Sequence, residues 1–337
     1  MVESAADFKA RLIRRTGLSP DAVAAAWPEW WSKDAEVSPS ANAELRFSLA
    51  RKLGLDPRSL LADGNEPRFI WDDAARFKGF TGDEHKERPV IASFGTALSR
   101  MLLEATRNDE NPNLQIGSAG ELRAAILAKS TYVGLRELLS VAWALGIPVI
   151  HLRLYPLSAK RMSAMSVRVG DRYAILLARD AIYPAPIAFY LAHELGHILL
   201  AHLTGGSAII DMDLLETVGM EKDPEEKEAD AFALELLTGR PQPELAVEGA
   251  GRGARQLAAE AMRVGQVERI EPGTVAMAFG HATGAWPTAM ASLAHIYDRA
   301  MDVWQVVNRL ANQQLAWNEL QDESESFVRA VMGTAHG

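Results

Sequence analysis

The sequence predicts an α+β protein that is mostly helical and contains one small, mainly antiparallel sheet. Three observations support this fold class. Helix caps with apolar periodicity recur along residues 4–60, and the pattern is helical again after residue 256. Between residues 147 and 178, β-branched apolar runs are separated by a Gly-Asp turn, which is typical of strands. The most apolar long run, residues 186–203, is interrupted by histidines and a glutamate and indicates a buried helix.

The N-terminal residues 1–62 form a predicted helical module. Ser4 is expected to cap a helix that ends at Gly17, and Ser19-Pro20-Asp21 opens a second helix. Ser40 is expected to cap the next helix, which ends at Gly54, and residues 57–61 add one more turn.

The remaining chain divides into three predicted regions. Residues 63–118 are a connector with a helix over 91–107, and residues 119–240 form an α+β core. Residues 241–337 form a C-terminal helical region, which is helical after a Pro/Gly-rich break at 239–256. Within the core we expect helices and strands in this order: helices 119–129 and 136–146, strands 147–154, 165–170 and 172–178, the apolar helix, a loop at 204–222, and a helix over 224–238.

Composition excludes several classes of protein. The 337 residues are 48% hydrophobic and 23% charged, as in an ordinary globular protein. There are no cysteines, so any metal site must use His, Asp and Glu. The net charge is −9, and residues 1–110 carry 16 basic against 18 acidic side chains, which argues against a general nucleic-acid binder. The N-terminus has no secretory signal and no run is a credible membrane span, so we expect a cytoplasmic protein without membrane contact.

The stretch YLAHELGHILLAH contains the strongest chemical signal. His193 and His197 lie four residues apart, so a helix places both imidazoles on one face, within reach of one ion. Glu194 follows the first histidine and can lie beside a metal without binding it. His202 lies about 180° around an ideal helix from His193 and is expected to face away. Two histidines require a third ligand from elsewhere in the chain.

The helix predicted at 224–238 offers that ligand. Asp223 as N-cap, Pro224 in the first position and Glu226 in a capping box account for its first turn. Glu228 has no such explanation and lies beside an apolar stripe, 31 residues after His197. We therefore predict that His193, His197 and Glu228 bind Zn²⁺. The alternative is that Glu228 is exposed and paired with a nearby Lys or Arg.

The two stretches HELGHILLAH and EEKEADAFALELL together resemble the ImmA/IrrE-type metallopeptidases, over about residues 120–240. The resemblance implies a zincin-like metallopeptidase core in which His193, His197 and Glu228 bind zinc and Glu194 is the general base. It also implies a protein substrate, namely an Xre-type repressor that controls stress or mobile-element genes. The sequence departs from the family in LLARDA, where a strand ending in Asn is typical.

Residues 1–62 weakly resemble an Xre-type helix-turn-helix. The position of the recognition helix holds Trp27-Pro28-Glu29-Trp30-Trp31, which is short of the side chains that contact bases and phosphates. We favour a degenerate module that packs on the core or binds protein, with sequence-specific DNA binding as the alternative.

The predicted activity is that of a zinc-dependent endopeptidase, in which Glu194 takes a proton from a zinc-bound water and later delivers it to the leaving amine. The strand Tyr173, Ala174, Ile175, Leu176 is expected to form the rim of the cleft and to pair with an extended substrate. Tyr183, Tyr190 and Arg179 are candidate partners for the oxyanion. The alternatives are a DNA- or protein-binding regulator with a non-catalytic zinc site, and a toxin–antitoxin or phage-defence component.

Overall fold

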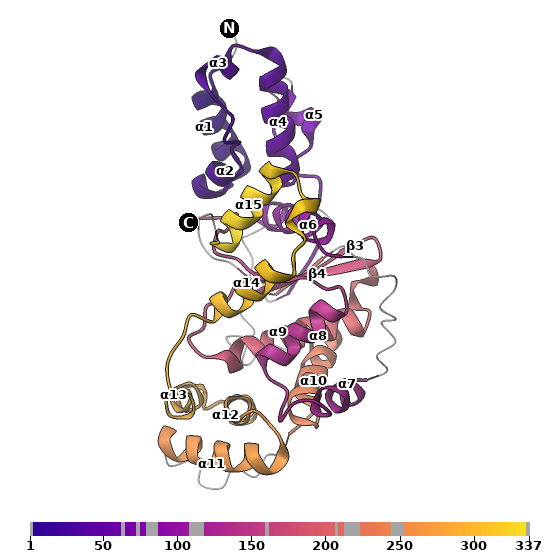
Figure 1. Cartoon of the computed structure of the whole chain (residues 1–337), viewed down its shortest axis with the longest axis vertical. Helices are drawn as coiled ribbons and strands as arrows, with labels where there is room; N and C mark the ends of the chain where they lie inside the picture. Colours follow the sequence, from indigo (N-terminus) through magenta and orange to yellow (C-terminus); the bar gives the residue numbers. More distant parts are fainter. Residues whose placement is uncertain are drawn as a thin grey trace.

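The protein is an α+β chain whose helices are arranged around one small sheet, as predicted. The computed structural model describes residues 3–61, 65–71, 75–78, 87–107, 118–158, 162–205, 208–211, 223–243 and 253–334. Figure 1 shows three tiers along the long axis: the N-terminal helices at one end, the sheet and its covering helices in the middle, and helices α11 to α13 at the other end.

The sheet has five strands in the order β1-β5-β3-β4-β2. The strands are β1 (Ala75–Lys78), β2 (Val149–His151), β3 (Ala164–Val169), β4 (Arg172–Leu177) and β5 (Ala208–Asp211). The predicted hairpin is present, because β3 and β4 pair antiparallel across Gly170, whose φ is 66°.

The prediction of a mainly antiparallel sheet is wrong, because two of the four pairings, β1 with β5 and β2 with β4, are parallel. Strands β1 and β5 fall in segments predicted to be a connector and a loop. Each is only four residues long, which is too short for an alternating pattern to stand out.

The N-terminal module folds as five short helices. They are α1 (Ala5–Thr16), α2 (Pro20–Ala26), α3 (Lys33–Glu36), α4 (Pro39–Leu53) and α5 (Pro57–Leu61). The Ser4 and Ser19 caps and the stops at Gly17 and Gly54 are confirmed. The cap of α4 is Ser38 rather than Ser40, because Pro39 occupies the first helical position and the Ser38 hydroxyl accepts from the amide of Ala41.

One hydrophobic cluster joins the module to the rest of the chain. Side chains of α1, α2 and α4 pack with α6 (Arg88–Glu104), with one face of the sheet and with α15 (Asp322–Met332). Phe94 of α6 and Phe327 of α15, for example, lie with ring centroids 6.0 Å apart in this cluster. The predicted boundary at residue 62 therefore crosses a continuous core.

Glu323 fastens the N-terminal helices to α15. Its carboxylate accepts hydrogen bonds from the Trp30 indole and the Ser48 hydroxyl, and it lies 3.2 Å from the ammonium of Lys52. Lys52 is 2% exposed, and burial lowers its pKa despite the nearby carboxylate. Residues 271 positions apart in the sequence are thus joined by an ion pair whose lysine is buried.

The other face of the sheet carries the second cluster. It is covered by α7 (Ala119–Leu127), α8 (Leu135–Ala144), α9 (Pro184–Leu199) and α10 (Pro224–Thr238). The C-terminal region does not form one unit. Helices α11 (Ala254–Glu268), α12 (Pro272–Thr283) and α13 (Trp286–Ile296) form a third cluster, whereas α14 (Val303–Gln314) packs on β2. None of the described helices combines the length and apolarity that crossing a membrane requires.

We predict that Glu323→Ala destabilises the whole protein. The change leaves the nearly buried Lys52 ammonium without its carboxylate and removes the acceptor of Ser48 and Trp30. The free energy of unfolding, measured by urea denaturation, should fall by about 2–3 kcal/mol. Glu319→Ala, at an exposed position in the preceding turn, is the control and should stay within about 0.5 kcal/mol. Equal losses in the two variants would contradict the role given to Glu323.

Candidate metal centre

Helix α9 carries the two histidines through the protein interior. Pro184 occupies its first turn, and its residues from Ala185 to Ile198 are all buried. Gly196 allows α10 to approach closely, because a Cβ at this position would lie 3.3 Å from the backbone of Ala229. A helix buried on all sides cannot leave imidazoles and a carboxylate without polar partners.

The two imidazoles face each other as the helical spacing predicts. The Nε2 atoms of His193 and His197 lie 3.0 Å apart, and both residues are 0% exposed. Helix α10 lies alongside and adds a carboxylate. The oxygens of Glu226 are 3.4 Å from Nε2 of His193 and 3.3 Å from Nε2 of His197. These three buried residues can hold a metal ion.

Glu228, the predicted third ligand, does not take part in this cluster. Its side chain is 64% exposed, and its carboxylate lies 3.1 Å from Nε2 of His202. Helical geometry explains the difference. Glu226 and Asp230 are four residues apart and share the face of α10 that packs on α9, whereas Glu228 points about 200° away from Glu226.

The sequence predicts a capping box with Asp223 as the N-cap and Glu226 as its partner. The Asp223 half of that prediction is confirmed. Asp223 is the N-cap, and its carboxylate accepts from the amide of Glu226 at 3.0 Å. The carboxylate of Glu226 itself is turned to the histidines. Burial raises its pKa, but when both imidazoles carry protons toward it, the hydrogen bonds and charges of His193 and His197 outweigh burial and hold the pKa well below its ordinary value. Glu226 is therefore ionised.

Asp230 sets the tautomer of His193. Its Oδ1 lies 3.0 Å from Nδ1 of His193, and its side chain is 10% exposed. A carboxylate only accepts, so Nδ1 of His193 carries the proton and Nε2 presents a lone pair. Asp230 was not among the predicted site residues. Its spacing of four residues from Glu226 is the signal that identifies it.

His202 does not face away from the site, as an ideal helix would require. Helix α9 ends at Leu199, Ala201 has a φ of 59°, and a 3-10 turn begins at His202. This reversal brings Nδ1 of His202 to 2.9 Å from Nδ1 of His197. Burial is the largest influence on His202 and lowers its pKa, so the ring is neutral near pH 7.

The hydrogen bonds that link Glu228, His202 and His197 therefore allow only one arrangement of protons on the two imidazoles. The Glu228 carboxylate requires a proton on Nε2 of His202, so Nδ1 of His202 is an acceptor. His197 must then donate from Nδ1, and its Nε2 presents a lone pair. Two imidazole lone pairs and a carboxylate thus converge without a proton between them. A metal ion bound by the neutral imidazoles and the carboxylate satisfies such a set of acceptors, so the residues fit a metal ion.

Glu194 faces the sheet beside this cluster. It is 0% exposed, and the hydroxyl of Ser166 on β3 donates to its Oε2. The contact holds the carboxylate against β3, on the same helix as the two histidines. Ser166 is a further site residue that sequence alone does not single out, because it is one of several small residues in an apolar strand.

The predicted substrate-binding strand is not available at two of its four residues. Ile175 and Leu176 of β4 pair with β3 on one side and with β2 on the other, and both are 0% exposed. Tyr173 and Ala174 pair with Arg168 and Val167 of β3. Strand addition by a substrate at Ile175 and Leu176 is therefore excluded, because their backbone groups already have partners.

The three predicted oxyanion candidates lie together. Tyr183, Tyr190 and Arg179 line one pocket near the beginning of α9. Tyr183 is the N-cap residue of α9, and its ring stacks on Tyr297 with centroids 5.3 Å apart. Their role at an oxyanion stays a prediction.

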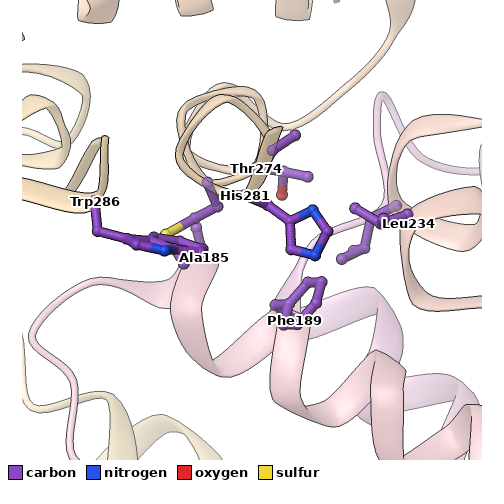
Figure 2. Close-up of a pocket in the computed structure, with 9 residues that line it drawn as sticks. Ala185, Phe189, Leu234, Thr274, His281 and Trp286 are labelled. Carbon is purple, nitrogen blue, oxygen red and sulfur yellow. The ribbon is translucent and has the colours of Figure 1, made fainter. Parts of the chain in front are cut away.

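A second pocket lies on the flank of α9. Figure 2 shows it between Phe189, Leu234 and His281, with Trp286 at one side. The Phe189 ring lies 6.5 Å from the His193 ring and 6.4 Å from the His281 ring. The free volume is about 10 Å³, which is room for one water molecule, so this pocket does not accept a side chain as it stands.

Comparisons with known proteins give no further guide to this site. No protein-family model, curated protein or solved structure matches the chain significantly.

We predict that Glu226→Gln removes metal binding and that Glu228→Gln retains it. The first change deletes an ionised ligand from the cluster. The second alters Glu228, which reaches the cluster only through two hydrogen bonds, by way of His202. Affinity for Zn²⁺, measured by competition with a chromogenic chelator, should be lost in the first variant. It should fall by no more than about 10–100-fold in the second. The reverse order would restore Glu228 as the ligand.

His202→Ala should weaken Zn²⁺ binding by about 10–100-fold without unfolding the protein, because His197 loses the acceptor that fixes its tautomer. The same competition assay measures the affinity, and circular dichroism reports folding. His281→Ala changes a more exposed histidine and serves as the control. Equal affinities in wild type and the His202 variant would show that the contact has no effect on the metal.

Proposed function

We propose that the protein is a zinc-dependent endopeptidase with a zincin-like core. The observation that carries the proposal is the convergence of His193, His197 and Glu226, with Glu194 buried on the same helix as the two histidines. Two imidazoles and one carboxylate are a donor set typical of catalytic zinc, which keeps a position open, and the absence of cysteines removes the common structural alternatives. When bound, Zn²⁺ would supply a Lewis acid that lowers the pKa of water and polarises a scissile carbonyl.

Glu194 would act as the general base. It would accept a proton from the water that attacks the scissile carbonyl carbon, and it would return that proton to the amine nitrogen when the C–N bond breaks. Ser166 supports this role, because its hydroxyl holds one carboxylate oxygen in place. Asp230 and His202 would keep both imidazoles in the tautomer that binds the metal.

The proposed substrate is a protein, and specifically an Xre-type repressor. The support is the resemblance of HELGHILLAH and EEKEADAFALELL to the ImmA/IrrE-type metallopeptidases. Asp230 occupies the Asn/Asp position of that pattern, where its contact with His193 gives the position a physical purpose. Co-expression with a repressor encoded next to this protein, followed by a gel for cleavage, tests the substrate.

The N-terminal helices are proposed to serve as a packing or protein-binding module. Their support is the apolar cluster shared with α6 and α15, and the contact of Trp30, one of the three tryptophans in residues 27–31, with Glu323. Direct DNA binding through residues 1–62 remains the alternative, and salt-dependent binding of a promoter fragment would favour it.

A non-catalytic zinc site is the second candidate function. It is favoured by the burial of His193, His197 and Glu194, each 0% exposed, because a peptide can reach these residues only if a covering element moves. Substitution with Co²⁺ separates the two cases. A visible spectrum that changes on addition of azide indicates an open coordination position, and an unchanged spectrum indicates a closed site.

We predict that Glu194→Gln retains zinc and loses proteolysis. The side chain keeps its size and its contact with Ser166 but can no longer accept the proton, so the cleavage rate should fall by at least about 10²–10⁴-fold. Zinc content is measured on the same preparation that is assayed for cleavage. Unchanged cleavage in the variant would refute the peptidase mechanism, and loss of zinc would show that Glu194 is part of the metal site.

A further inference from the structure

A large pocket lies where the segment after β4 meets the beginnings of α9 and α14. Its volume is about 400 Å³, which is in the range of pockets that bind small ligands or side chains. The apolar pocket of Figure 2 has about 10 Å³ by comparison. Among these two, only the larger pocket has room for a ligand as it stands.

The pocket lies on the metal-bearing face of α9. Pro186 and Tyr190 line it, and they precede His193 and His197 on one stripe of the helix, at spacings of four, three and four residues. One helical turn rises about 5.4 Å, so the pocket begins roughly one turn from the first of the two histidines. A ligand in the pocket would therefore lie beside a substrate at the proposed centre.

Much of the wall suits an apolar stem. Tyr183 and Trp304 contribute aromatic rings, and Ile182 and Met290 are 55% and 39% exposed. Large apolar side chains that stay exposed around a concave site are surfaces that a ligand can cover. An alkyl chain of three or four carbons is the kind of group that packs along such a wall.

The charges of the pocket favour a cation at one point. Arg153 lies 2.5 Å from Asp180 and stacks over Trp304 at 4.7 Å. The opposite charges of Arg153 and Asp180 therefore neutralise each other. Arg179 has interactions within the chain. The carboxylate of Asp302 accepts from Gln305 at 3.3 Å, and in the part of the chain that the structure describes no Lys or Arg lies within 4 Å of it. Asp302 also makes no side-chain capping bond to α14.

We infer that this pocket binds a cationic group on an apolar stem, with Asp302 as its counter-charge. Within the proposed endopeptidase, the occupant is a lysine or arginine side chain of the protein substrate, close to the bond that is cleaved. The identity of the occupant rests on the proposed function, whereas binding of the cation does not. Arg179 also lines the pocket and would attract an acidic ligand, so an acidic probe is the third arm of the experiment.

Binding is tested with the full chain, loaded with Zn²⁺, by following NMR shifts during titration with three acetylated amino-acid amides. Arginine amide should bind at least about fivefold more tightly than citrulline amide, its uncharged isostere, and glutamate amide should bind most weakly. Asp302→Asn should abolish the difference between the first two probes. Asp298→Asn, an exposed neighbour outside the pocket, should preserve it. Equal affinities in the wild type, no binding at tens of millimolar, or preference for the glutamate probe would overturn the inference.

The source of the cation is tested by digestion of a peptide library, with cleavage sites mapped by mass spectrometry. Wild type should show Lys or Arg enriched at one position beside the cleaved bond. Asp302→Asn should lose the enrichment while it keeps its zinc. Cleavage without a basic preference would overturn the substrate assignment. Failure to cleave any peptide, with arginine selectivity retained in the titration, would refute the proposed function and leave the cation site standing as a site for a free ligand.

Discussion

Mutual repulsion among two imidazole lone pairs and a carboxylate is the constraint on which the site depends. His193 and His197 are each fixed by a hydrogen bond at Nδ1, so neither ring can relieve the repulsion by changing tautomer. Because these acceptors are buried, water cannot donate hydrogen bonds to them. A cation converts the same arrangement from unfavourable to favourable, and its binding energy would therefore contribute to the stability of the fold.

The surrounding structure holds these groups from three directions. Helix α9 supplies the histidines, and Gly196 lets α10 approach until Glu226 reaches them. The first turn of α10 is held by its Asp223 cap and by Arg76 of β1, which lies 2.7 Å from Glu225 and also donates to the carbonyl of His202. The short edge strand β1 thus supports both α10 and the turn that returns His202 to the site.

Sequence reasoning succeeds where local periodicity decides the outcome and fails where tertiary packing decides it. The spacing of His193 and His197 predicts their shared face, because it depends only on helical geometry. The sequence assigns Glu226 to a capping box and not to the metal site, because a capping role explains the residue adequately. Which face of α10 packs on α9 cannot be read from the sequence of α10 alone. The prediction that His202 faces away is wrong because it assumes that the helix continues. The positive φ of Ala201 reverses the chain there, although the sequence has no glycine or proline at that point to indicate a helix end. Strands β1 and β5 become strands only through their long-range pairing.

The ion pair between Lys52 and Glu323 has a consequence for biosynthesis. The apolar faces of α1, α2 and α4 are synthesised long before Phe327 and Val331, which help to cover their cluster. Contacts that join such distant positions form slowly, and the uncovered helices resemble the surfaces that chaperones bind. The nascent chain would therefore stay incompletely folded until α15 is made, and a stop codon before α15 would expose this surface for the lifetime of the protein.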